Sequence, residues 1–306
     1  MTLPGFLVIG AGRSGTTSLH HHLGAHPEVF VPTVKSPSHF YCRDRPVPRD
    51  RTRRAEVRQH FVADPADYER LFDRAGDAKA VGEVSPVYLA ATDVAPRIAA
   101  RLPEVRLIAL LRHPAERVHA RFVGRRRDGL ERRTDLARVV RDERRAPLLC
   151  DDAAGTYLAA GFCGRFLATY FERFPRQRIR IHLFEDLRRD PRAVLRDLYE
   201  FLGVDPSFAP DLARRHNASG GTIGNPAARW LWTRSAPLRL RLRPHLPATL
   251  RGRVFARFTR RLEPVPLAPE LRAELTELYR DDIQRLGGLI GRDLGHWLAV
   301  PDGSAS

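Results

Sequence analysis

A short apolar run followed at once by a glycine-rich segment is the feature that most constrains this chain. Residues 6–9 are apolar, residues 10–17 read GAGRSGTT, and the stretch from Ser14 to Leu23 has the pattern of a helix. A buried strand, a tight glycine turn and a helix N-terminus together direct backbone N–H groups at one point, which is the geometry of an anion site. The segment therefore predicts a phosphate-binding loop.

The loop has the spacing of a nucleotide P-loop, with one substitution. Gly10 and Gly15 are separated by four residues, Thr17 keeps the hydroxyl, but Thr16 stands where an NTPase would have lysine. The positive side chain is Arg13, inside the loop. Because an NTPase uses its lysine to reach the β- and γ-phosphates beside Mg²⁺, the substitution argues against ATP or GTP hydrolysis and favours a grip on one 5′-phosphate. The candidate phosphate-binding residues are Gly12, Arg13, Ser14, Gly15, Thr16 and Thr17.

Two other interpretations of the same loop are weaker. The glycines also satisfy the dinucleotide pattern G-x-G-x-x-G, but that pattern expects an acidic residue about twenty positions later. Residues 31–35 hold no acid. A glycine turn that binds nothing is the remaining alternative, and it leaves the coincidence of strand, basic residue and paired hydroxyls unexplained.

Strands and helices are expected to alternate along the chain. Apolar runs predict further strands at 29–31, 106–111 and 179–184, and helical spacing predicts helices at 93–102, 162–174, 191–202 and 269–286. This order predicts an α/β fold: one P-loop-like domain over residues 1–306, with a central, mostly parallel sheet and helices on both faces. Segments near 43–58 and 124–145 are dense in charge and are interpreted as exposed insertions.

Composition bounds the class of protein. The 306 residues are 43% hydrophobic, which is enough for a sizeable core, and no apolar stretch approaches the ~18 residues of a membrane span. The N-terminus has no signal-peptide pattern, and three cysteines without metal-ligand spacing fit a reducing compartment, so a cytoplasmic location is expected. The net charge of +16, almost entirely from arginine, favours anionic ligands.

The glycine-rich loop and several later segments resemble the PAPS-dependent sulfotransferases, closest to the bacterial and Golgi carbohydrate branch (PAPS is 3′-phosphoadenosine 5′-phosphosulfate). The resemblance continues through most of the chain. It is carried by RSGTT at 13–17, HPEV at 26–29, GEVSPVY at 82–88, LLRHP at 110–114, FEDL at 184–187, FLGV at 201–204 and GRDL at 291–294.

The resemblance implies a sulfuryl donor, PAPS, and roles for three basic residues. Arg13 occupies the place of the family's loop lysine, which contacts the bridging oxygen, and Lys35 resembles a second basic position near the sulfate. Arg112 follows a buried strand and is expected to bind the 3′-phosphate. The family usually has serine eight residues later, where this chain has Ala120, so a contact is missing or His119 or Arg121 replaces it.

The general base stays open between two residues. The carbohydrate branch often has glutamate just after the position of Lys35, where this chain has Ser36. His39 is the nearest group that accepts a proton near neutral pH, and Glu83 is the alternative. Residues 216–229, ending at Arg229, resemble the loop that closes over the nucleotide.

The expected function is transfer of a sulfuryl group from PAPS to a hydroxyl or amine of an acceptor, by in-line displacement and without a metal. The acceptor is not identified; a small molecule, glycan or lipid fits, and a carbohydrate or glycolipid is expected. Two rivals are a P-loop small-molecule kinase and a nucleic-acid or polyanion binder, since residues 229–261 interleave arginine with tryptophan and phenylalanine. No sequence-specific nucleic-acid motif accompanies that stretch, which would equally suit an anionic membrane face. The oligomeric state is not indicated.

Overall fold

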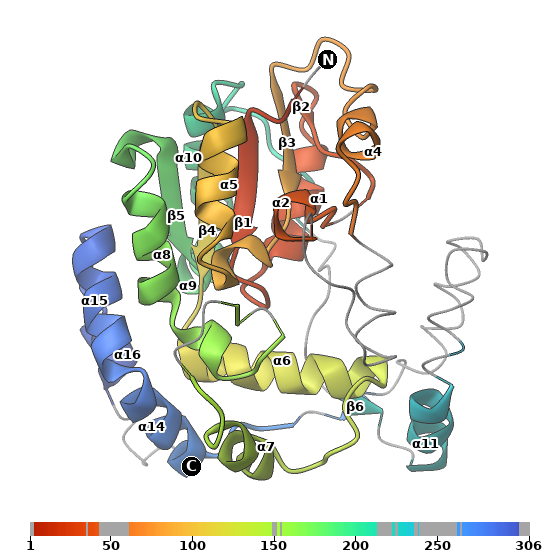
Figure 1. Cartoon of the computed structure of the whole chain (residues 1–306), viewed down its shortest axis with the longest axis vertical. Coiled ribbons are helices and arrows are strands. Elements are labelled where there is room, and N and C mark those ends of the chain that lie inside the picture. The colour runs from red at the N-terminus through yellow and green to blue at the C-terminus, as the bar shows by residue number, and fades with distance from the viewer. Residues whose placement is uncertain are drawn as a thin grey trace.

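The computed structural model shows a central five-stranded sheet with helices on both faces (Figure 1). The structure describes residues 3–34, 36–42, 61–148, 152–153, 155–212, 222–223, 226–235, 238, 262–263 and 265–299.

All neighbouring strands of the sheet are parallel. Across the sheet they are β2 (Val29–Phe30), β3 (Ala80–Val84), β1 (Phe6–Gly10), β4 (Arg106–Leu111) and β5 (Ile179–Leu183). Phe6 of β1 lies opposite Gly82 of β3 and Arg106 of β4. The predicted parallel sheet is confirmed, and β1, which leads into the glycine-rich loop, is its central strand.

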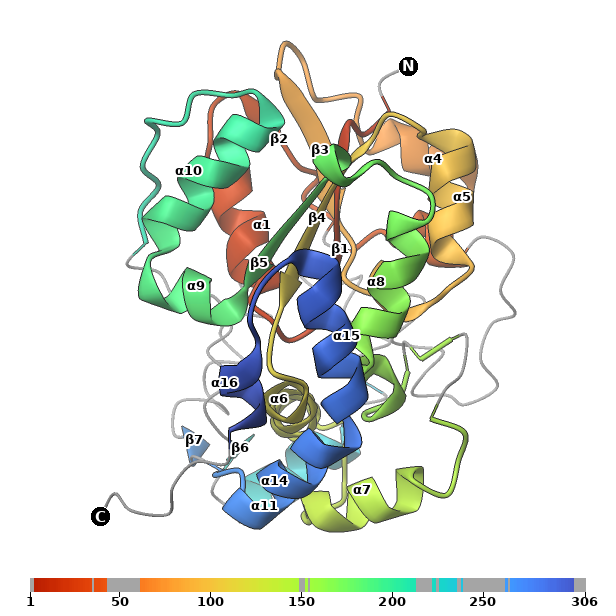
Figure 2. The same cartoon turned by 90° about the vertical axis from the view of Figure 1, so that its left-hand side faces the viewer.

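Two groups of helices cover the two faces of the sheet, as Figure 2 shows. On one face lie α1 (Thr16–Gly24), α9 (Phe184–Arg189) and α10 (Pro191–Leu202). On the other lie α5 (Val94–Arg101) and α8 (Cys163–Phe171), and α15 (Arg280–Ile290) packs against α8.

The apolar run of β1 follows from this layering. Phe6 and Val8 are buried in the core shared with α1 and α10, and Leu7 and Ile9 in the core shared with α5 and α8. A strand covered on both faces needs apolar residues at every position, because neither side reaches water.

Helix α6 (Pro114–Asp128) follows β4 and lies beneath the sheet in Figure 1. It begins with the His113 side chain accepting the Ala115 N–H at 3.2 Å and with Pro114 in the first turn, where its missing N–H costs nothing. It ends at Gly129, whose φ of +78° is the left-handed conformation that glycine adopts without strain.

Smaller elements complete the described part of the chain. The helices are α2 (His39–Cys42), α4 (Pro65–Arg70), α7 (Leu136–Glu143), α11 (Pro226–Arg234), α14 (Pro269–Leu278) and α16 (Gly295–Leu298). Single 3₁₀ turns span Tyr88–Ala90, Ala159–Gly161 and Arg176–Arg178, and β6 (Thr222–Ile223) pairs antiparallel with β7 (Leu262–Glu263). No helix among the described residues is both long and apolar enough to span a bilayer.

The structure differs from the sequence-based expectation in two places. The charged segment 124–145 is not simply an exposed insertion, because α6 runs to Asp128 and α7 buries Val139 and Val140 in the core. The single helix expected over 269–286 is two helices, since the backbone leaves the helical conformation at Tyr279. The insertion expected at 43–58 lies outside the described residues.

Candidate active site

The glycine-rich loop joins β1 to α1 at the carboxyl end of the sheet. The Ala11 N–H donates to the Leu110 carbonyl at 2.8 Å, which ties the loop to the end of β4. Gly15 has φ +94°, and a Cβ there would lie 3.1 Å from Leu187, so a larger residue would be both strained and crowded. A Cβ on Gly12 would meet nothing within 4 Å, so the loop is open on that side.

The loop residues fit an anion such as the 5′-phosphosulfate. The Ser14 side chain is fully buried, yet its hydroxyl has no hydrogen-bond partner among the described residues. Helix α1 begins at Thr16 and Thr17 with no acidic residue in its first turn and no side-chain cap. Because orphaned N–H groups and the helix dipole favour negative charge, this end of α1 suits a phosphate group.

Arg13 extends from the loop across α6. Its backbone has φ +73°, and its guanidinium lies against Gly124, where an added Cβ would come within 2.4 Å of Nη1. The nearest Asp128 carboxylate oxygen is 3.9 Å from Nη2, at the limit of an ion pair. The side chain is 28% exposed, so its charge stays accessible beside the loop.

Arg112 follows the last residue of β4, one strand away from the loop. Its guanidinium donates to Glu116 at 2.9 Å and to the Arg13 carbonyl at 3.4 Å, and it lies 4.6 Å from the centroid of the Phe184 ring. Its Nε is buried without a partner in the described structure. A buried donor of this kind is costly unless a ligand satisfies it, which fits the predicted 3′-phosphate contact.

Glu116 joins Arg112 to the C-terminal helices. One carboxylate oxygen accepts from Arg112, and the other lies 3.8 Å from Nε of Arg272 on α14. Burial alone would raise the pKa of Glu116, but the hydrogen bond and charge of Arg112, with smaller effects of His113 and Arg272, hold the pKa below its usual value. Glu116 is therefore a carboxylate at neutral pH.

Ala120 stands where the family usually has serine, and its neighbours His119 and Arg121 have different surroundings. Ala120 is buried. Nε2 of His119 is buried without a partner among the described atoms, and burial lowers the pKa of this imidazole, as does the nearby charge of Arg112. Arg121 extends toward the ring of Tyr157, 5.8 Å from its centroid. Replacement of the serine by His119 or Arg121 stays a prediction.

Glu83 lies on β3 inside a hydroxyl cluster and is only 1% exposed. Tyr88 donates to one carboxylate oxygen at 2.6 Å and Ser85 to the other at 3.3 Å, while the Tyr68 hydroxyl approaches without a hydrogen bond of ordinary geometry. Burial raises the pKa of Glu83 to about 7, although the hydroxyls oppose the shift. The group thus titrates near neutrality but is enclosed.

His39, the other candidate base, lies next to this cluster. Its ring stacks on Tyr68 with centroids 4.3 Å apart, and Nδ1 lies 2.9 Å from the Val62 carbonyl, so Nδ1 carries the proton. Its segment is tethered to the turn that follows β3, because the Ser38 N–H donates to the Ser85 hydroxyl at 3.0 Å. The structure therefore brings His39 and Glu83 into one cluster through Tyr68.

The structure does not describe two of the predicted site side chains. Lys35 lies outside the described residues, and Arg229 is described only as part of the backbone of α11. The loop predicted over 216–229 is described only at Thr222, Ile223 and from Pro226 onward.

Sequence reasoning missed the residues that hold the two arginines in place. Glu116 was detectable, since an acid four residues after Arg112 on a helix is a standard ion-pair spacing. Gly124 and Asp128 gave no local signal, because their role depends on how α6 packs against the loop. Within the described residues no group of three or more His, Cys, Asp or Glu side chains could hold a metal, and the metal-free chemistry stays a prediction.

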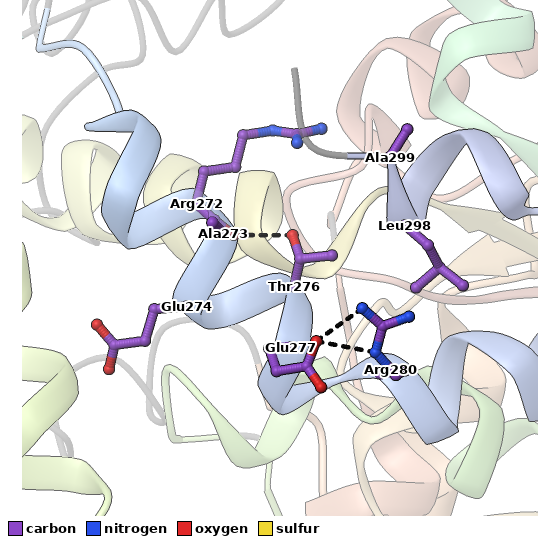
Figure 3. Close-up of a pocket in the computed structure, with 8 residues that line it drawn as sticks. All are labelled: Arg272, Ala273, Glu274, Thr276, Glu277, Arg280, Leu298 and Ala299. Carbon is purple, nitrogen blue, oxygen red and sulfur yellow. Dashed lines mark hydrogen bonds and ion pairs between the residues drawn. The ribbon is translucent and has the colours of Figure 1, made fainter. Parts of the chain in front are cut away.

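A cavity of about 330 Å³ lies between α14 and α16 (Figure 3). Its polar side chains already have partners: Glu277 pairs with Arg280 at 2.7 Å, the Thr276 hydroxyl donates to the Arg272 carbonyl at 2.7 Å, and Glu274 pairs with Arg144 at 2.9 Å. It includes none of the loop residues, so the candidate site is the loop and the end of β4, not this cavity.

Comparison with known proteins agrees with this geometry. The family model described as "Sulfotransferase family" matches residues 4–209. A solved sulfotransferase from Alicyclobacillus acidocaldarius is 26% identical, with a TM-score of 0.74 over 98% of this chain and 100% of that one.

Two curated relatives from Mus musculus are also similar. Bifunctional heparan sulfate N-deacetylase/N-sulfotransferase 2 is 26% identical over 206 residues, which are 67% of this chain and 22% of the relative. Heparan sulfate glucosamine 3-O-sulfotransferase 3A1 is 23% identical over 296 residues, 96% of this chain and 64% of the relative. The chain thus spans about a fifth of the bifunctional relative and under two thirds of the second. The family model, which covers two thirds of the chain, agrees with the loop, Arg112 and the parallel sheet, and leads to one conclusion: this chain belongs to the sulfotransferase family.

Proposed function

We propose that the protein transfers the sulfuryl group of PAPS to a hydroxyl or amine of a carbohydrate-containing acceptor. The observation that supports PAPS as the donor is the presence of two basic groups at the ends of adjacent strands, Arg13 after β1 and Arg112 after β4. The proposal that the acceptor contains a carbohydrate rests on the names of the relatives, which refer to heparan sulfate. A cytoplasmic location belongs to the same proposal and rests on the sparse cysteines alone.

Arg13 is proposed to stabilise the leaving group. When the acceptor oxygen or nitrogen attacks sulfur, the bond from sulfur to the bridging oxygen breaks and negative charge grows on the 5′-phosphate. The Arg13 guanidinium, held against Gly124 beside the loop, supplies a fixed fork of donors to that charge. Lys35 is proposed as a second positive charge near the sulfate, on the resemblance alone.

Arg112 is proposed to hold the donor rather than to act on the reacting bond. Its Nε lacks a partner among the described atoms, while Glu116 and Phe184 fix the rest of the guanidinium. A group held in this way needs little ordering when the 3′-phosphate binds, which favours affinity.

His39 is proposed as the general base that accepts the proton of the acceptor. Because Nδ1 donates to the Val62 carbonyl, Nε2 is the nitrogen that accepts a proton. Both oxygens of Glu83 already accept hydrogen bonds from Tyr88 and Ser85, so Glu83 is proposed to fix the cluster against which His39 packs.

Two measurements test this proposal. The first is a screen of glycan, glycolipid and phenolic acceptors with PAPS labelled in the sulfuryl group; transfer only to phenols would overturn the carbohydrate acceptor. The second compares His39→Gln with Glu83→Gln on the acceptor found. Loss of the base should lower kcat roughly 10²- to 10⁴-fold in His39→Gln. A larger loss of kcat in Glu83→Gln, with both variants folded, would transfer the role of base to Glu83.

A further inference from the structure

Helix α11 exposes an apolar surface that the catalytic site does not use. In the described part of the chain, the most exposed large hydrophobic side chains are Trp230 at 60% and Leu231 at 53%, both on α11, and Leu238 at 59%, four residues beyond its end. Single exposed leucines need no explanation, but a tryptophan and two leucines within nine residues do. Figure 1 shows α11 at the edge of the molecule, away from the sheet.

The outward direction of this surface is set by Trp232. That side chain is 3% exposed, and its indole N–H donates to the Arg127 carbonyl on α6 at 2.8 Å. Since successive helical residues are 100° apart, Trp230 and Leu231 lie on the side of α11 away from Trp232, with Arg234 between them. The Arg234 guanidinium lies 5.1 Å from the centroid of the Trp230 ring. The exposed face of α11 therefore combines an aromatic ring, an aliphatic side chain and a cation.

The sequence around α11 has an extreme charge bias. Residues 212–262 contain twelve arginines and no aspartate, glutamate or lysine, so this stretch contributes +12 to the chain's net charge of +16. A partner for α11 must therefore tolerate or prefer high positive charge beside apolar side chains.

We propose that the outward face of α11, formed by Trp230, Leu231 and Arg234, binds the surface of an anionic lipid bilayer, and that the exposed Leu238, which follows the helix in sequence, contributes to the contact. Tryptophan favours the interface between headgroups and acyl chains, leucine is stabilised by burial below it, and each basic residue near an anionic surface adds electrostatic attraction. The chain is then a peripheral membrane protein held by a helix that lies on the bilayer without crossing it.

Nucleic acid fits the same face less well. A single-strand binder stacks bases on exposed aromatic rings. Trp232 is buried as the anchor of α11 and cannot stack, and leucine side chains at 231 and 238 offer no π-face. Aliphatic side chains are stabilised by burial among the acyl chains of a bilayer, whereas they contribute little to binding a nucleic acid.

Helix α6 connects α11, which carries the proposed membrane-binding face, to the loop that holds Arg13. Trp232 bonds to the backbone of Arg127, and the next residue, Asp128, is the partner of Arg13. The proposal does not depend on the identity of the donor or acceptor, so it can fail while the sulfotransferase activity stands.

Tryptophan fluorescence gives the sharpest test. The chain has three tryptophans, and Trp232 and Trp297 are buried at 3% and 2% exposed. Vesicles of phosphatidylcholine and phosphatidylserine with brominated acyl chains should therefore quench the full-length protein's emission through Trp230 alone. Quenching should disappear in Trp230→Phe while the protein still sediments with the vesicles. Unchanged quenching in Trp230→Phe, or no quenching in the parent, would overturn the proposal.

Sedimentation with vesicles tests affinity and charge. The double variant Trp230→Ser/Leu231→Ser should partition into phosphatidylserine-containing vesicles at least roughly tenfold less than the parent. Val34→Ser, at an exposed apolar position outside α11, is the matched control and should partition like the parent. Equal binding to pure phosphatidylcholine vesicles, equal partition of the double variant, or displacement from vesicles by a single-stranded oligonucleotide that binds more tightly would each contradict a lipid face.

Discussion

The side chains of Arg112 and Glu116 form an ion pair across the start of α6, with Nη2 of Arg112 2.9 Å from Oε2 of Glu116. The pair holds the guanidinium over Phe184 and beside the backbone of Arg13, so that the end of β4 and the loop after β1 share one edge of the sheet. Ligands of open parallel sheets bind at this edge, where strands end and loops begin. The two arginines are close in space, but Arg112 is expected to affect mainly the KM for PAPS and Arg13 mainly kcat.

Replacing Arg112 should weaken donor binding more than it slows chemistry. The charge of a 3′-phosphate does not change during transfer, so its contacts contribute equally to the ground state and the transition state. Arg112→Ala should raise the KM for PAPS roughly tenfold to a hundredfold, the loss of one or two charge-assisted hydrogen bonds. The KM of Arg112→Lys should lie between those of the parent and Arg112→Ala, because lysine keeps the charge but lacks the paired N–H donors of the guanidinium. Steady-state kinetics in PAPS would contradict this role if kcat fell and KM stayed the same.

Replacing Arg13 should slow the chemical step more than it weakens donor binding. Its charge meets one that grows only as the sulfur–oxygen bond breaks, so Arg13→Ala should lower kcat by roughly 10²- to 10³-fold. Arg13→Lys should keep much of the rate, since the family itself uses lysine at this position. Single-turnover measurements with saturating PAPS separate this loss from any loss of binding. An Arg13→Ala variant with full kcat would show that the charge does not reach the reacting bond.

Gly124 offers a way to move Arg13 without mutating it. An alanine Cβ at 124 would lie 2.4 Å from Nη1 of Arg13, and the end of a flexible side chain can retreat where backbone cannot. Gly124→Ala should therefore lower kcat in the manner of Arg13→Ala, while leaving the thermal transition close to that of the parent. The control is Gly288→Ala on α15, where an added Cβ meets nothing within 4 Å. Equal kcat in the two alanine variants would remove the packing of Arg13 on Gly124 from the account.

Glu83 should make stability depend on pH in the direction opposite to a surface carboxylate. Burial raises its pKa from 4.5 to about 7, so in the folded protein it binds a proton more tightly than in the unfolded chain. Its favourable contribution is complete below pH 4.5 and is lost as pH rises through about 7. The free energy of unfolding of the parent, relative to Glu83→Gln, should fall by roughly 3 kcal/mol between those limits. Urea titrations at several pH values measure the difference, and a pH-independent difference would mean that Glu83 has an ordinary pKa.

The parts of the fold that were predictable are those with a local cause. β4 occupies the predicted residues Arg106–Leu111, and α10 the predicted Pro191–Leu202, because continuous apolar residues in one case and proline and glycine boundaries in the other depend only on nearby sequence. The loop from Gly10 to Thr17 was predictable for the same reason, since strand, glycines and helix are contiguous.

The parts that were not predictable depend on contacts between distant segments. No helix was predicted at the position of α6. Arginine is rarely buried, yet Arg117 of this helix is 2% exposed and donates to the Tyr157 carbonyl. Tyr68 was overlooked because its contacts with His39 and Glu83 join segments far apart in sequence. Hydrophobic periodicity carries no information about either.

The central claim is that two anion sites, at Arg13 and at Arg112, hold one nucleotide with phosphates at both its 5′ and 3′ positions. The most direct test is calorimetric titration of the full chain with adenosine 3′,5′-bisphosphate, with adenosine 5′-monophosphate and with ATP. Adenosine 3′,5′-bisphosphate should bind the most tightly, at least roughly tenfold better than the 5′-monophosphate, and Arg112→Ala should abolish that preference. Equal affinity for the two adenosine nucleotides, or tighter binding of ATP, would contradict the account.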